Sequence, residues 1–563
     1  MTVDVRNFHS ALAAHRLVVR FVWLLTVIGL ATGSADWGQA AAKTTTKTTA
    51  KKPEPKSNAA AKKPETAKAT ADDDEKDEPK KKRNPDQDDD EKPDEDSKKE
   101  PQAPTSYTLQ TIPLAIDPLI RATSKAASWG VKIVIRETGA SVFEYNQNTP
   151  FIPASNRKIF TSALALDQLG PNFKFQTVLY RTGKVEGSLL KGNLVIKPSG
   201  DPTFNSEMYR ASHTDWVFRD WAKKVADSGV TAVQGDLLID CSDWNMRDMT
   251  PRGWPGRIMQ DNYAPQTSPL TLNENLVNVI VNPGDKGQPG VVTFAPPAPG
   301  YPISNQTVSG GKGRVSIKRS SSGLIASGVA AKAGGGAVIP CDNPTLFAAA
   351  NFRHHLKEAG VTINGAVRMI STKGALPGFT NESLIAVVES PPMSEIVKHL
   401  MKHSNNHFAE QVYVAISAAK LGTGGYTASR RLEETLLVKA GINPKNMGYY
   451  DGSGLSELNR VSPDQVCKVL NFMMTHPAAG PFFDSMAVSG RDGTLAHRMG
   501  TPQLAGRVHA KTGTINYVKC LSGYLTLAPN RTLTFSFLVN NIRGGSISGT
   551  MDRICGLLST LVI

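Results

Sequence analysis

The sequence predicts an α+β fold, an antiparallel sheet flanked by helices, that is interrupted by a long β-rich insertion. Alternation of apolar and polar residues, which is typical of strands, occurs at 131–145 and again at 507–539. Helical periodicity lies between these regions, at 155–169 and 394–420. Because strands from both ends of the folded chain need one core, we expect a sheet that is completed late in the sequence.

The N-terminus has the order of a secretory signal. Arg6, Arg16 and Arg20 precede an apolar run at 21–31, and small residues follow it. The run is shorter than the roughly 20 residues that span a bilayer. We therefore predict a cleaved signal at 1–42, with an uncleaved membrane anchor as the alternative. Export to the periplasm or cell envelope is expected, and membrane contact only if the signal stays attached.

Residues 43–106 differ in composition from the rest of the 563-residue chain. They include 16 basic and 17 acidic residues and no large apolar residue, which predicts a disordered linker. The formal net charge of +14 therefore belongs to the folded remainder. Two interpretations stay open, a solvated basic surface or attraction to a polyanionic cell envelope. Export and the lack of a binding motif argue against nucleic acid as a partner.

The first folded elements are predicted to be a helix at 116–128 and a β-hairpin. The hairpin is indicated by alternation at 131–135, a Thr-Gly turn, and a second apolar run at 142–145. An apolar helix then begins near Ser155 and ends at the Gly-Pro pair 170–171.

Short strands and turns rich in Gly and Pro extend from 172 to 382, and they predict one or two inserted β-rich domains. The flanking segments 107–171 and 383–563 are expected to form a single catalytic domain. Helices are predicted at 394–402 and 408–420.

The C-terminal region predicts strands at 507–514, 520–527 and 533–539. The last of these alternates strictly between apolar and polar residues, which predicts antiparallel strands with one buried face. An amphipathic stretch at 551–561 closes the chain.

Ser155 and Lys158 lie one helical turn apart at the start of the apolar helix. Residues i and i+3 share a helix face, so the amine lies within reach of the hydroxyl. A desolvated lysine near other cations loses its proton readily and can serve as a base for the serine. The spacing alone is common, and the alternative is an N-cap serine beside an exposed lysine.

Two further segments carry matching chemistry. Ser404 and Asn406 lie in a break between two helices, where a hydroxyl can relay a proton and an amide can bind a carbonyl. Lys511, Gly513 and Thr514 belong to a Lys-Thr-Gly-Thr run that is predicted on a strand. The lysine offers positive charge for a carboxylate, the glycine lets a substrate backbone approach, and the Thr514 N–H offers an oxyanion donor.

In this order, S-x-x-K, S-x-N and K-T-G resemble the motifs of penicillin-binding proteins and serine β-lactamases. About 250 residues separate the first two motifs. This interval resembles the class C low-molecular-mass penicillin-binding proteins, which are the D-alanyl-D-alanine carboxypeptidases/endopeptidases of peptidase family S13. Further matching segments include Gly200-Asp201-Pro202, Asn273-Glu274-Asn275 and residues 451–456. The resemblance covers residue 115 to the C-terminus.

The resemblance implies a transpeptidase fold of the penicillin-binding and β-lactamase type, and acyl transfer to a serine. Ser155 is expected to attack the penultimate D-Ala carbonyl of a peptidoglycan stem peptide, with Lys158 as the base. Ser404 would pass the proton to the departing D-Ala. β-Lactams are expected to acylate the same serine.

The resemblance also assigns the substrate-binding residues. Asn406 is expected to bind the peptide and help to hold the base. Lys511, Thr512 and Thr514 would receive the terminal carboxylate, with Gly513 between them. The N–H groups of Thr514 and of the nucleophile would form the oxyanion hole.

Two other functions stay open. A β-lactamase or esterase would use the same residues, but such an enzyme is expected to be smaller and to lack the insertion. A non-catalytic wall-binding scaffold would rely on the linker and the basic surface, and the intact catalytic motifs argue against it.

No metal and no cofactor are expected. His399, His403 and His407 are spaced by four residues, but no H-E-x-x-H glutamate accompanies them. His354 and His355 are predicted on a helix surface. The five cysteines lack C-x-x-C spacing, so we expect buried free thiols, with a disulfide between residues 241 and 341 as the alternative.

Overall fold

The computed structural model describes residues 106–206, 214–528 and 531–563. The predicted signal and nearly all of the predicted linker lie outside the described residues. Among the helices in the described ranges, none has the length and apolar character needed to cross a bilayer.

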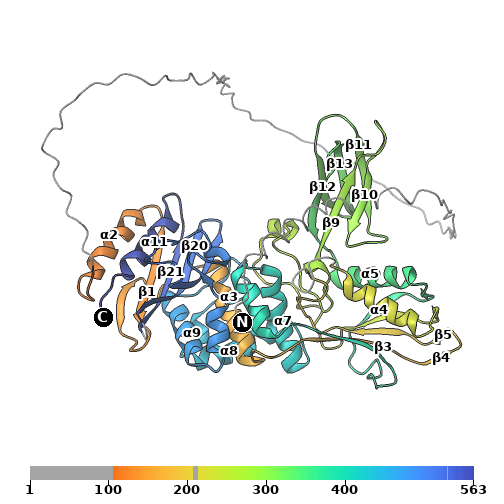
Figure 1. Cartoon of the computed structure of the whole chain (residues 1–563), viewed down its shortest axis with the longest axis horizontal. Helices are drawn as coiled ribbons and strands as arrows, with labels where there is room; N and C mark the ends of the chain where they lie inside the picture. Colours follow the sequence, from red (N-terminus) through yellow and green to blue (C-terminus); the bar gives the residue numbers. More distant parts are fainter. Residues whose placement is uncertain (1–105, 207–213, 529–530) are drawn as a thin grey trace, which may run out of the picture. The chain divides into compact units, whose positions relative to one another are not determined.

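A six-stranded antiparallel sheet joins the two ends of the described chain, in the order β18-β19-β20-β21-β1-β2 (Figure 1). The strands are β1 (Ser128–Ile135), β2 (Ser141–Tyr145), β18 (Ala487–Val488), β19 (Val508–Ile515), β20 (Val518–Ala528) and β21 (Arg531–Asn540). β1 pairs with β21 along its whole length, from Ser128 opposite Asn540 to Ile135 opposite Leu533. The predicted hairpin, the predicted C-terminal strands and the late completion of the sheet are therefore confirmed.

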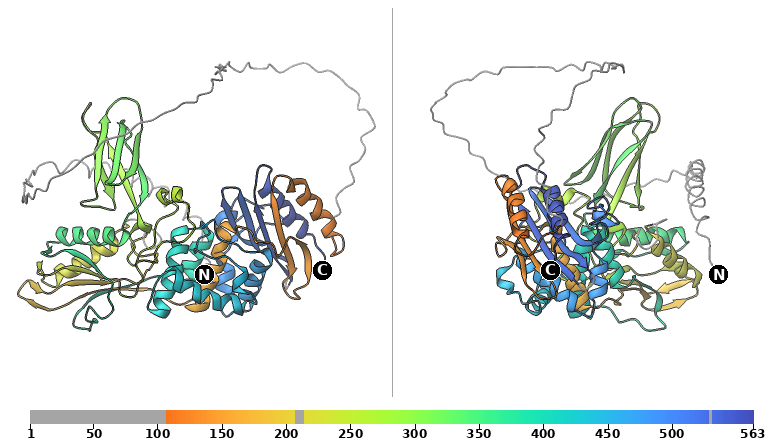
Figure 2. Two further views of the ribbon diagram at one scale, coloured as in Figure 1. Left: turned by 180° about the vertical axis from the view of Figure 1, so that it is seen from behind. Right: turned by 60° about the vertical axis from the view of Figure 1, so that its left-hand side comes forward.

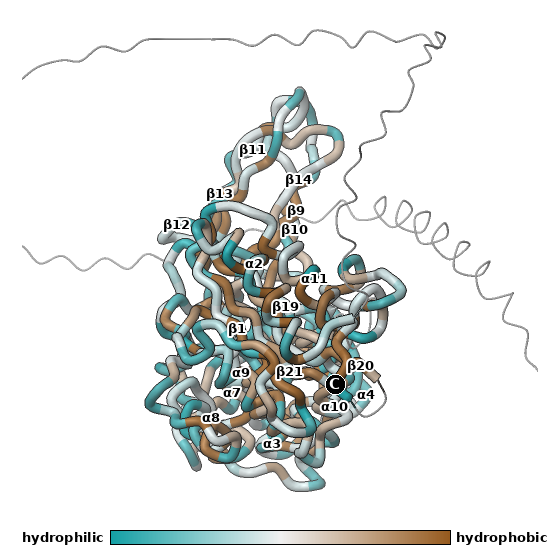
Figure 3. The backbone as a smooth tube through the Cα atoms, turned by 90° about the vertical axis from the view of Figure 1, so that its left-hand side faces the viewer, coloured by the Kyte–Doolittle hydropathy of each residue, from teal (hydrophilic) through white to brown (hydrophobic). Residues whose placement is uncertain are grey.

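Helices cover both faces of this sheet (Figures 1 and 2). On one face, α2 (Ile112–Ser124) and α11 (Ile547–Leu558) share an apolar core with alternate residues of β21, which are Leu533, Phe535, Phe537 and Val539. On the other face, Leu538 of β21 and Tyr524 of β20 belong to the core formed with α3 and α9. Figure 3 shows the central strands β1, β20 and β21 as mostly hydrophobic.

The prediction of one buried face was wrong, because the polar residues that alternate with the apolar ones are also buried. Ser522 Oγ and Ser536 Oγ hydrogen-bond at 2.9 Å, and Thr534 Oγ1 donates to Asn471 Oδ1 at 2.6 Å. Polar side chains that satisfy each other can be buried at small cost. Alternation in the sequence does not distinguish this arrangement from a solvated face.

The helices that the sequence predicted near the sheet are present, with small shifts at their ends. α2 begins and ends four residues earlier than predicted, because Pro113 is tolerated in the first helical turn and Ser128 already belongs to β1. The other predicted helices are α3 (Arg157–Gln168), α6 (Met393–Lys402) and α7 (Asn406–Leu421). Three helices in this region were not predicted, and they are α8 (Tyr426–Lys439), α9 (Pro463–Thr475) and α10 (Ala479–Asp484).

The inserted region is β-rich, as predicted. Its largest sheet has the order β16-β8-β6-β3-β17, formed by Val367–Ile370, Leu237–Asp240, Leu194–Lys197, Gln176–Arg181 and Leu384–Glu389. A second sheet, β15-β7-β5-β4, consists of Thr362–Ile363, Ala232–Val233, Leu189–Lys191 and Lys184–Glu186. Two helices that the sequence did not predict, α4 (Trp216–Asp227) and α5 (Pro344–Glu358), pack beside these sheets.

Two three-stranded sheets complete the insertion. One has the order β10-β9-β14, formed by Val291–Ala295, Leu276–Asn282 and Gly335–Pro340. The other, β11-β13-β12, is formed by Ile303–Ser309, Gly323–Ala330 and Val315–Ser320.

The inserted sheet extends past the predicted boundary at residue 382. β17 pairs with β3, and these two strands are the segments by which the chain leaves and enters the insertion. Because β17 pairs with β3, β17 belongs to the inserted sheet. The remaining domain boundaries stay predictions.

Candidate active site

Ser155 lies in a 3-10 turn, η2 (Ala154–Asn156), that leads directly into α3. Residue Ala154 adopts a left-handed conformation with φ of 45°, which turns the chain sharply before the serine. Asn156 anchors the turn to the sheet, because its Nδ2 donates to Lys511 O at 2.7 Å. The serine is thereby held between the start of a buried helix and β19.

Lys158 has three hydrogen-bond acceptors around its amine. Its Nζ lies 3.0 Å from Ser155 Oγ, 2.6 Å from Asn406 Oδ1 and 2.9 Å from Ser453 O. Burial lowers the pKa of Lys158 to about 7, although the charges of Glu410 and Asp451 act in the opposite direction. A large fraction of the amine is therefore neutral near pH 7 and able to accept a proton.

The Ser404-Asn405-Asn406 segment links α6 to α7. Ser404 has a φ of 54°, and the Asn405 side chain caps α7 by accepting a hydrogen bond from Phe408 N at 2.9 Å. Asn406 Nδ2 donates to Tyr263 O at 2.8 Å. The cap and the left-handed residue direct the Ser404 hydroxyl toward Lys511. They direct the Asn406 amide toward Lys158.

Lys511 lies on β19 and is fully buried. Its Nζ donates to Ser404 Oγ and to Thr512 O, both at 2.9 Å. Burial and the nearby charge of Lys158 lower the pKa of Lys511 well below its ordinary value. The Thr512 hydroxyl donates to Thr494 Oγ1 at 2.8 Å. Hydrogen bonds thus connect S-x-x-K to S-x-N through Lys158 and Asn406, and S-x-N to K-T-G through Ser404 and Lys511.

A cavity of about 810 Å³ opens over these motifs. It is lined by Ser155, Ser404, Asn406 and Thr514, and also by Arg257, Ile258 and Tyr263 from the insertion and by Tyr517. Lys511 lies behind Ser404 rather than in the cavity wall. An organic ligand in this cavity would meet the candidate nucleophile, the S-x-N hydroxyl and amide, and the end of β19 at once.

Gly513 makes its close contact with the protein itself. A Cβ atom at this position would lie 3.1 Å from both Pro153 O and Ser155 N. The missing side chain therefore allows β19 to pack against the turn that holds the nucleophile, a role that the sequence-based prediction did not include.

Several residues near the site were not predicted. Glu410 on α7 and the Ser453 carbonyl support Lys158, and Asn405 Nδ2 donates to Glu274 Oε2 at 2.9 Å. Residues 451–456 and the Asn-Glu-Asn segment were recognisable as motifs. The contact of Lys158 with the Ser453 carbonyl was not predictable, because every residue has a backbone carbonyl. Their roles depend on contacts between distant segments.

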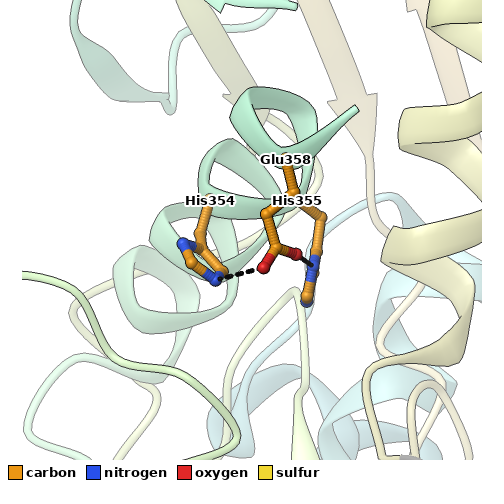
Figure 4. A group of neighbouring side chains, drawn as sticks. All are labelled: His354, His355 and Glu358. Carbon is orange, nitrogen blue, oxygen red and sulfur yellow. Dashed lines mark hydrogen bonds and ion pairs between the residues drawn. The ribbon is translucent and has the colours of Figure 1, made fainter. Parts of the chain in front are cut away.

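A second cluster of titratable side chains lies on α5 in the insertion and contains His354, His355 and Glu358 (Figure 4). His355 is buried, contrary to the prediction of a surface position, and its ring nitrogens lie 2.9 Å from Asp215 Oδ2 and 2.7 Å from Glu358 Oε2. Burial alone would raise the pKa of Asp215. Hydrogen bonds from His355 and Arg219 outweigh this effect and hold the pKa well below its usual range. The cluster therefore has a structural role, because its ion pairs link α5 to the start of α4.

All five cysteines are buried and free, which confirms the prediction of unpaired thiols.

Comparisons with known proteins agree with the motif geometry. Residues 115–561 match the model of the D-Ala-D-Ala carboxypeptidase 3 (S13) family. The chain is 31% identical over 454 residues to a D-alanyl-D-alanine carboxypeptidase of an Actinomadura species, covering 76% of this chain and 80% of that protein. It is 26% identical over 447 residues to the D-alanyl-D-alanine carboxypeptidase DacB of Haemophilus influenzae, covering 73% and 85% respectively.

A solved structure shares the fold. The crystal structure of penicillin binding protein 4 (dacB) from Haemophilus influenzae matches with a TM-score of 0.65 at 22% identity, covering 79% of this chain and 98% of that one. The same protein has been crystallised with a β-lactam. The family match over residues 115–561 confirms the resemblance seen in the motifs, and the chain is a member of the D-Ala-D-Ala carboxypeptidase 3 (S13) family.

Proposed function

We propose that this protein is a serine-type D-Ala-D-Ala carboxypeptidase that acts on peptidoglycan stem peptides through an acyl-enzyme at Ser155. The observation that carries the proposal is the convergence of three motifs on one cavity. Ser155 Oγ, Lys158 Nζ and Asn406 Oδ1 are joined by contacts of 3.0 and 2.6 Å, and a second lysine contacts the S-x-N hydroxyl at 2.9 Å. An ordinary capping serine has no need of these partners.

Acylation begins when neutral Lys158 accepts the proton of the Ser155 hydroxyl. The serine oxygen then bonds to the carbonyl carbon of the penultimate D-Ala, and the carbonyl oxygen becomes negatively charged. The N–H groups of Ser155 and Thr514 stabilise this oxyanion. A single donor of this kind is worth roughly 3–4 kcal/mol of barrier in other serine enzymes.

The tetrahedral intermediate collapses when the C–N bond breaks and the terminal D-Ala departs. Ser404 donates its hydroxyl proton to the departing nitrogen, and Lys511, which donates to Ser404 Oγ at 2.9 Å, replaces that proton. Before this transfer, protonated Lys511 and the hydroxyls of Thr512 and Thr514 favour the terminal carboxylate at this end of the cavity. Water then attacks the ester carbonyl carbon and gives a proton through Ser404 to the neutral Lys511. The ester C–O bond breaks, Lys158 returns its proton to the Ser155 oxygen, and the shortened peptide leaves as a carboxylic acid.

A β-lactam follows the same first steps, because the carbonyl of its strained amide and its carboxylate are arranged like those of D-Ala-D-Ala. The acyl adduct persists if water attacks it slowly.

Labelling with a fluorescent penicillin tests the proposal. We expect the wild-type protein to be labelled and Ser155→Ala to remain unlabelled, while Ser162→Ala, a change at a buried serine on α3, keeps the label. Release of D-Ala from a synthetic pentapeptide should be lost in the same variant. Label on Ser155→Ala would contradict the nucleophile assignment.

The same assays separate the alternatives. A cross-linked peptide dimer measures endopeptidase activity beside carboxypeptidase activity. Rapid turnover of penicillin without a lasting adduct would favour a β-lactamase, and an unlabelled, inactive wild type would favour a wall-binding scaffold.

We further propose that the protein is exported and acts in the cell envelope, with residues 1–42 as the signal. The order of basic, apolar and small residues supports this proposal. Cell fractionation and N-terminal sequencing of the mature protein test it. An intact N-terminus on a cytoplasmic protein would refute it, and an intact N-terminus in the membrane fraction would favour the anchor.

A further inference from the structure

Glu410 is a buried carboxylate that lies one helical turn after Asn406 on α7. It contacts neither Ser155 nor the cavity. Its oxygens accept hydrogen bonds from Gly452 N at 3.0 Å, from Ser453 N at 2.6 Å and from the Tyr426 hydroxyl at 2.8 Å. Because residues i and i+4 share a helix face, Glu410 lies on the same side of α7 as Asn406, which contacts the Lys158 amine at 2.6 Å.

Glu410 is linked to the Lys158 amine through the backbone of Ser453. The Ser453 N–H points at Glu410, and the Ser453 carbonyl accepts a hydrogen bond from Lys158 Nζ at 2.9 Å. The turn at 452–453 is therefore held between a carboxylate and the candidate base. A shift of this turn would change the direction of the lysine amine relative to the Ser155 hydroxyl.

A negative charge at Glu410 also acts on Lys158 through space. It favours the protonated amine and so opposes the effect of burial. Burial and the charge of Asp451 raise the pKa of Glu410 to about 7, which is also the pKa to which Lys158 is lowered. The two groups therefore exchange or release protons in the same pH range.

The other charged groups around Glu410 and Lys158 are Asp451, Lys511 and the Arg157–Glu433 ion pair. Asp451 accepts hydrogen bonds from Trp254 Nε1, Gly454 N, Ser456 N and Asn459 Nδ2. Lys511 is buried on β19, and burial and the charge of Lys158 lower its pKa well below the ordinary value. Arg157 is paired with Glu433 at 2.6 Å, so this neighbouring pair has no net charge.

We propose that Glu410 is a positioning residue that holds the Ser453 carbonyl against Lys158 and controls how readily this lysine gives up its proton. The inference rests on the proposed function, in which Lys158 is the base that activates Ser155. It adds a residue outside the three motifs to the machinery of acylation.

The Glu410→Gln variant tests the proposal, because it removes the charge and keeps most of the hydrogen bonds. The amide oxygen can accept from both backbone N–H groups, and the amide NH₂ can donate to the Tyr426 oxygen. The measurement is the second-order rate of acylation by penicillin as a function of pH. The pKa of Glu410 is itself about 7, so its negative charge is only partly present at the midpoint of the acid limb. Loss of this charge makes the lysine easier to deprotonate, and we expect the midpoint to move down by about a few tenths of a pH unit to one pH unit.

Matched controls separate this effect from a structural one. Glu434 on α8 accepts a hydrogen bond from the Tyr449 hydroxyl at 3.3 Å, which is a second Tyr–Glu pair away from Lys158. Glu434→Gln and Tyr449→Phe should leave the acid limb unmoved. Tyr426→Phe removes one donor to Glu410 and should move the limb in the same direction as Glu410→Gln, by a smaller amount.

The possible outcomes are distinguishable. If Glu410→Gln is folded and its acid limb coincides with that of the wild type, the proposal is overturned while the proposed function stands. If Glu410→Gln fails to fold, an unmoved limb in Tyr426→Phe overturns the proposal. If Lys158→Arg keeps the wild-type rate and acid limb, Lys158 is not the base, and both the assigned mechanism and this inference fail.

Discussion

At the scale of single residues, Lys158 carries the pH dependence of the proposed reaction. Its amine is surrounded by Ser155 Oγ, Asn406 Oδ1 and Ser453 O, and the residue is fully buried. Desolvation penalises the charged form of a lysine, and here it lowers the pKa to about 7. An exposed lysine at the same spacing would remain protonated and could not act as a base.

We therefore expect the rate of acylation of Ser155 to fall as the pH falls through about 7. Below this pH Lys158 gains its proton and loses the ability to accept one, and above it the neutral amine predominates. Stopped-flow measurement of penicillin acylation between about pH 5 and pH 9 checks this expectation. A rate independent of pH across this range would contradict the assignment of Lys158 as the base.

At the scale of elements, the end of one helix and the start of the next position the S-x-N residues. α6 ends before Ser404, and Asn405 caps α7 through its hydrogen bond from Phe408 N. The same side chain donates to Glu274 of the insertion. The middle residue of the motif thus determines where its two neighbours point.

Replacement of the capping residue, Asn405→Ala, should lower the free energy of unfolding by about 1 kcal/mol, the usual cost of losing an N-cap. Acylation should also slow, because Ser404 and Asn406 flank the changed residue. Chemical denaturation and penicillin acylation measure the two effects.

A matched control is Asn343→Ala, since Asn343 caps α5 by accepting from Leu346 N at 3.1 Å. This variant should lose similar stability and keep the wild-type acylation rate. Equal slowing of acylation in both variants would show that the effect is general rather than local to the S-x-N segment.

At the scale of the whole molecule, the insertion helps to build the candidate active site. Trp254 donates to Asp451, the Tyr263 carbonyl accepts from Asn406, and both segments lie near the cavity. Gln411 on α7 bonds Ser268 N at 3.1 Å, Ser268 O at 2.8 Å and Gly200 O at 3.1 Å. One buried amide therefore connects the S-x-N helix to two loops of the insertion.

A change at this amide, Gln411→Leu, keeps the side-chain volume and leaves three buried backbone groups without their partner. Each unsatisfied group costs about 1–3 kcal/mol, so we expect a loss of at least about 2 kcal/mol in the free energy of unfolding. Gln176→Leu removes an exposed hydrogen bond to Glu389 and should change stability by less than about 0.5 kcal/mol. Comparable losses in the two variants would refute a special role for the Gln411 contacts.

Much of the fold was predictable because its signals are local. Strict alternation in β21 and the apolar periodicity of α3 identified these elements directly. The burial of Ser522 and Ser536 was not predictable, because their mutual hydrogen bond joins two strands. The helices α4 and α5 were missed within a region whose Gly and Pro content resembled strands and turns throughout.

Part of the candidate site was likewise predictable from the sequence, and part of it was not. Ser155, Ser404 and Lys511 were recognisable by residue type and order, whereas the contribution of Glu410 depends on a turn that lies about 40 residues further along the chain. Gly513 was recognised as a position for close approach, but only the structure shows that the approaching backbone belongs to Pro153 and Ser155.

The sequence by itself determined the order of the motifs, the family, and the candidate nucleophile, because these follow from residue types and their spacing. The tertiary structure decided that Lys158 is buried, which groups contact it, and which charges oppose the loss of its proton. The physical reason is that a pKa depends on desolvation and on charges within a few ångströms in space. The residues that impose them on Lys158 come from α7 and the 451–454 turn, far away in the sequence.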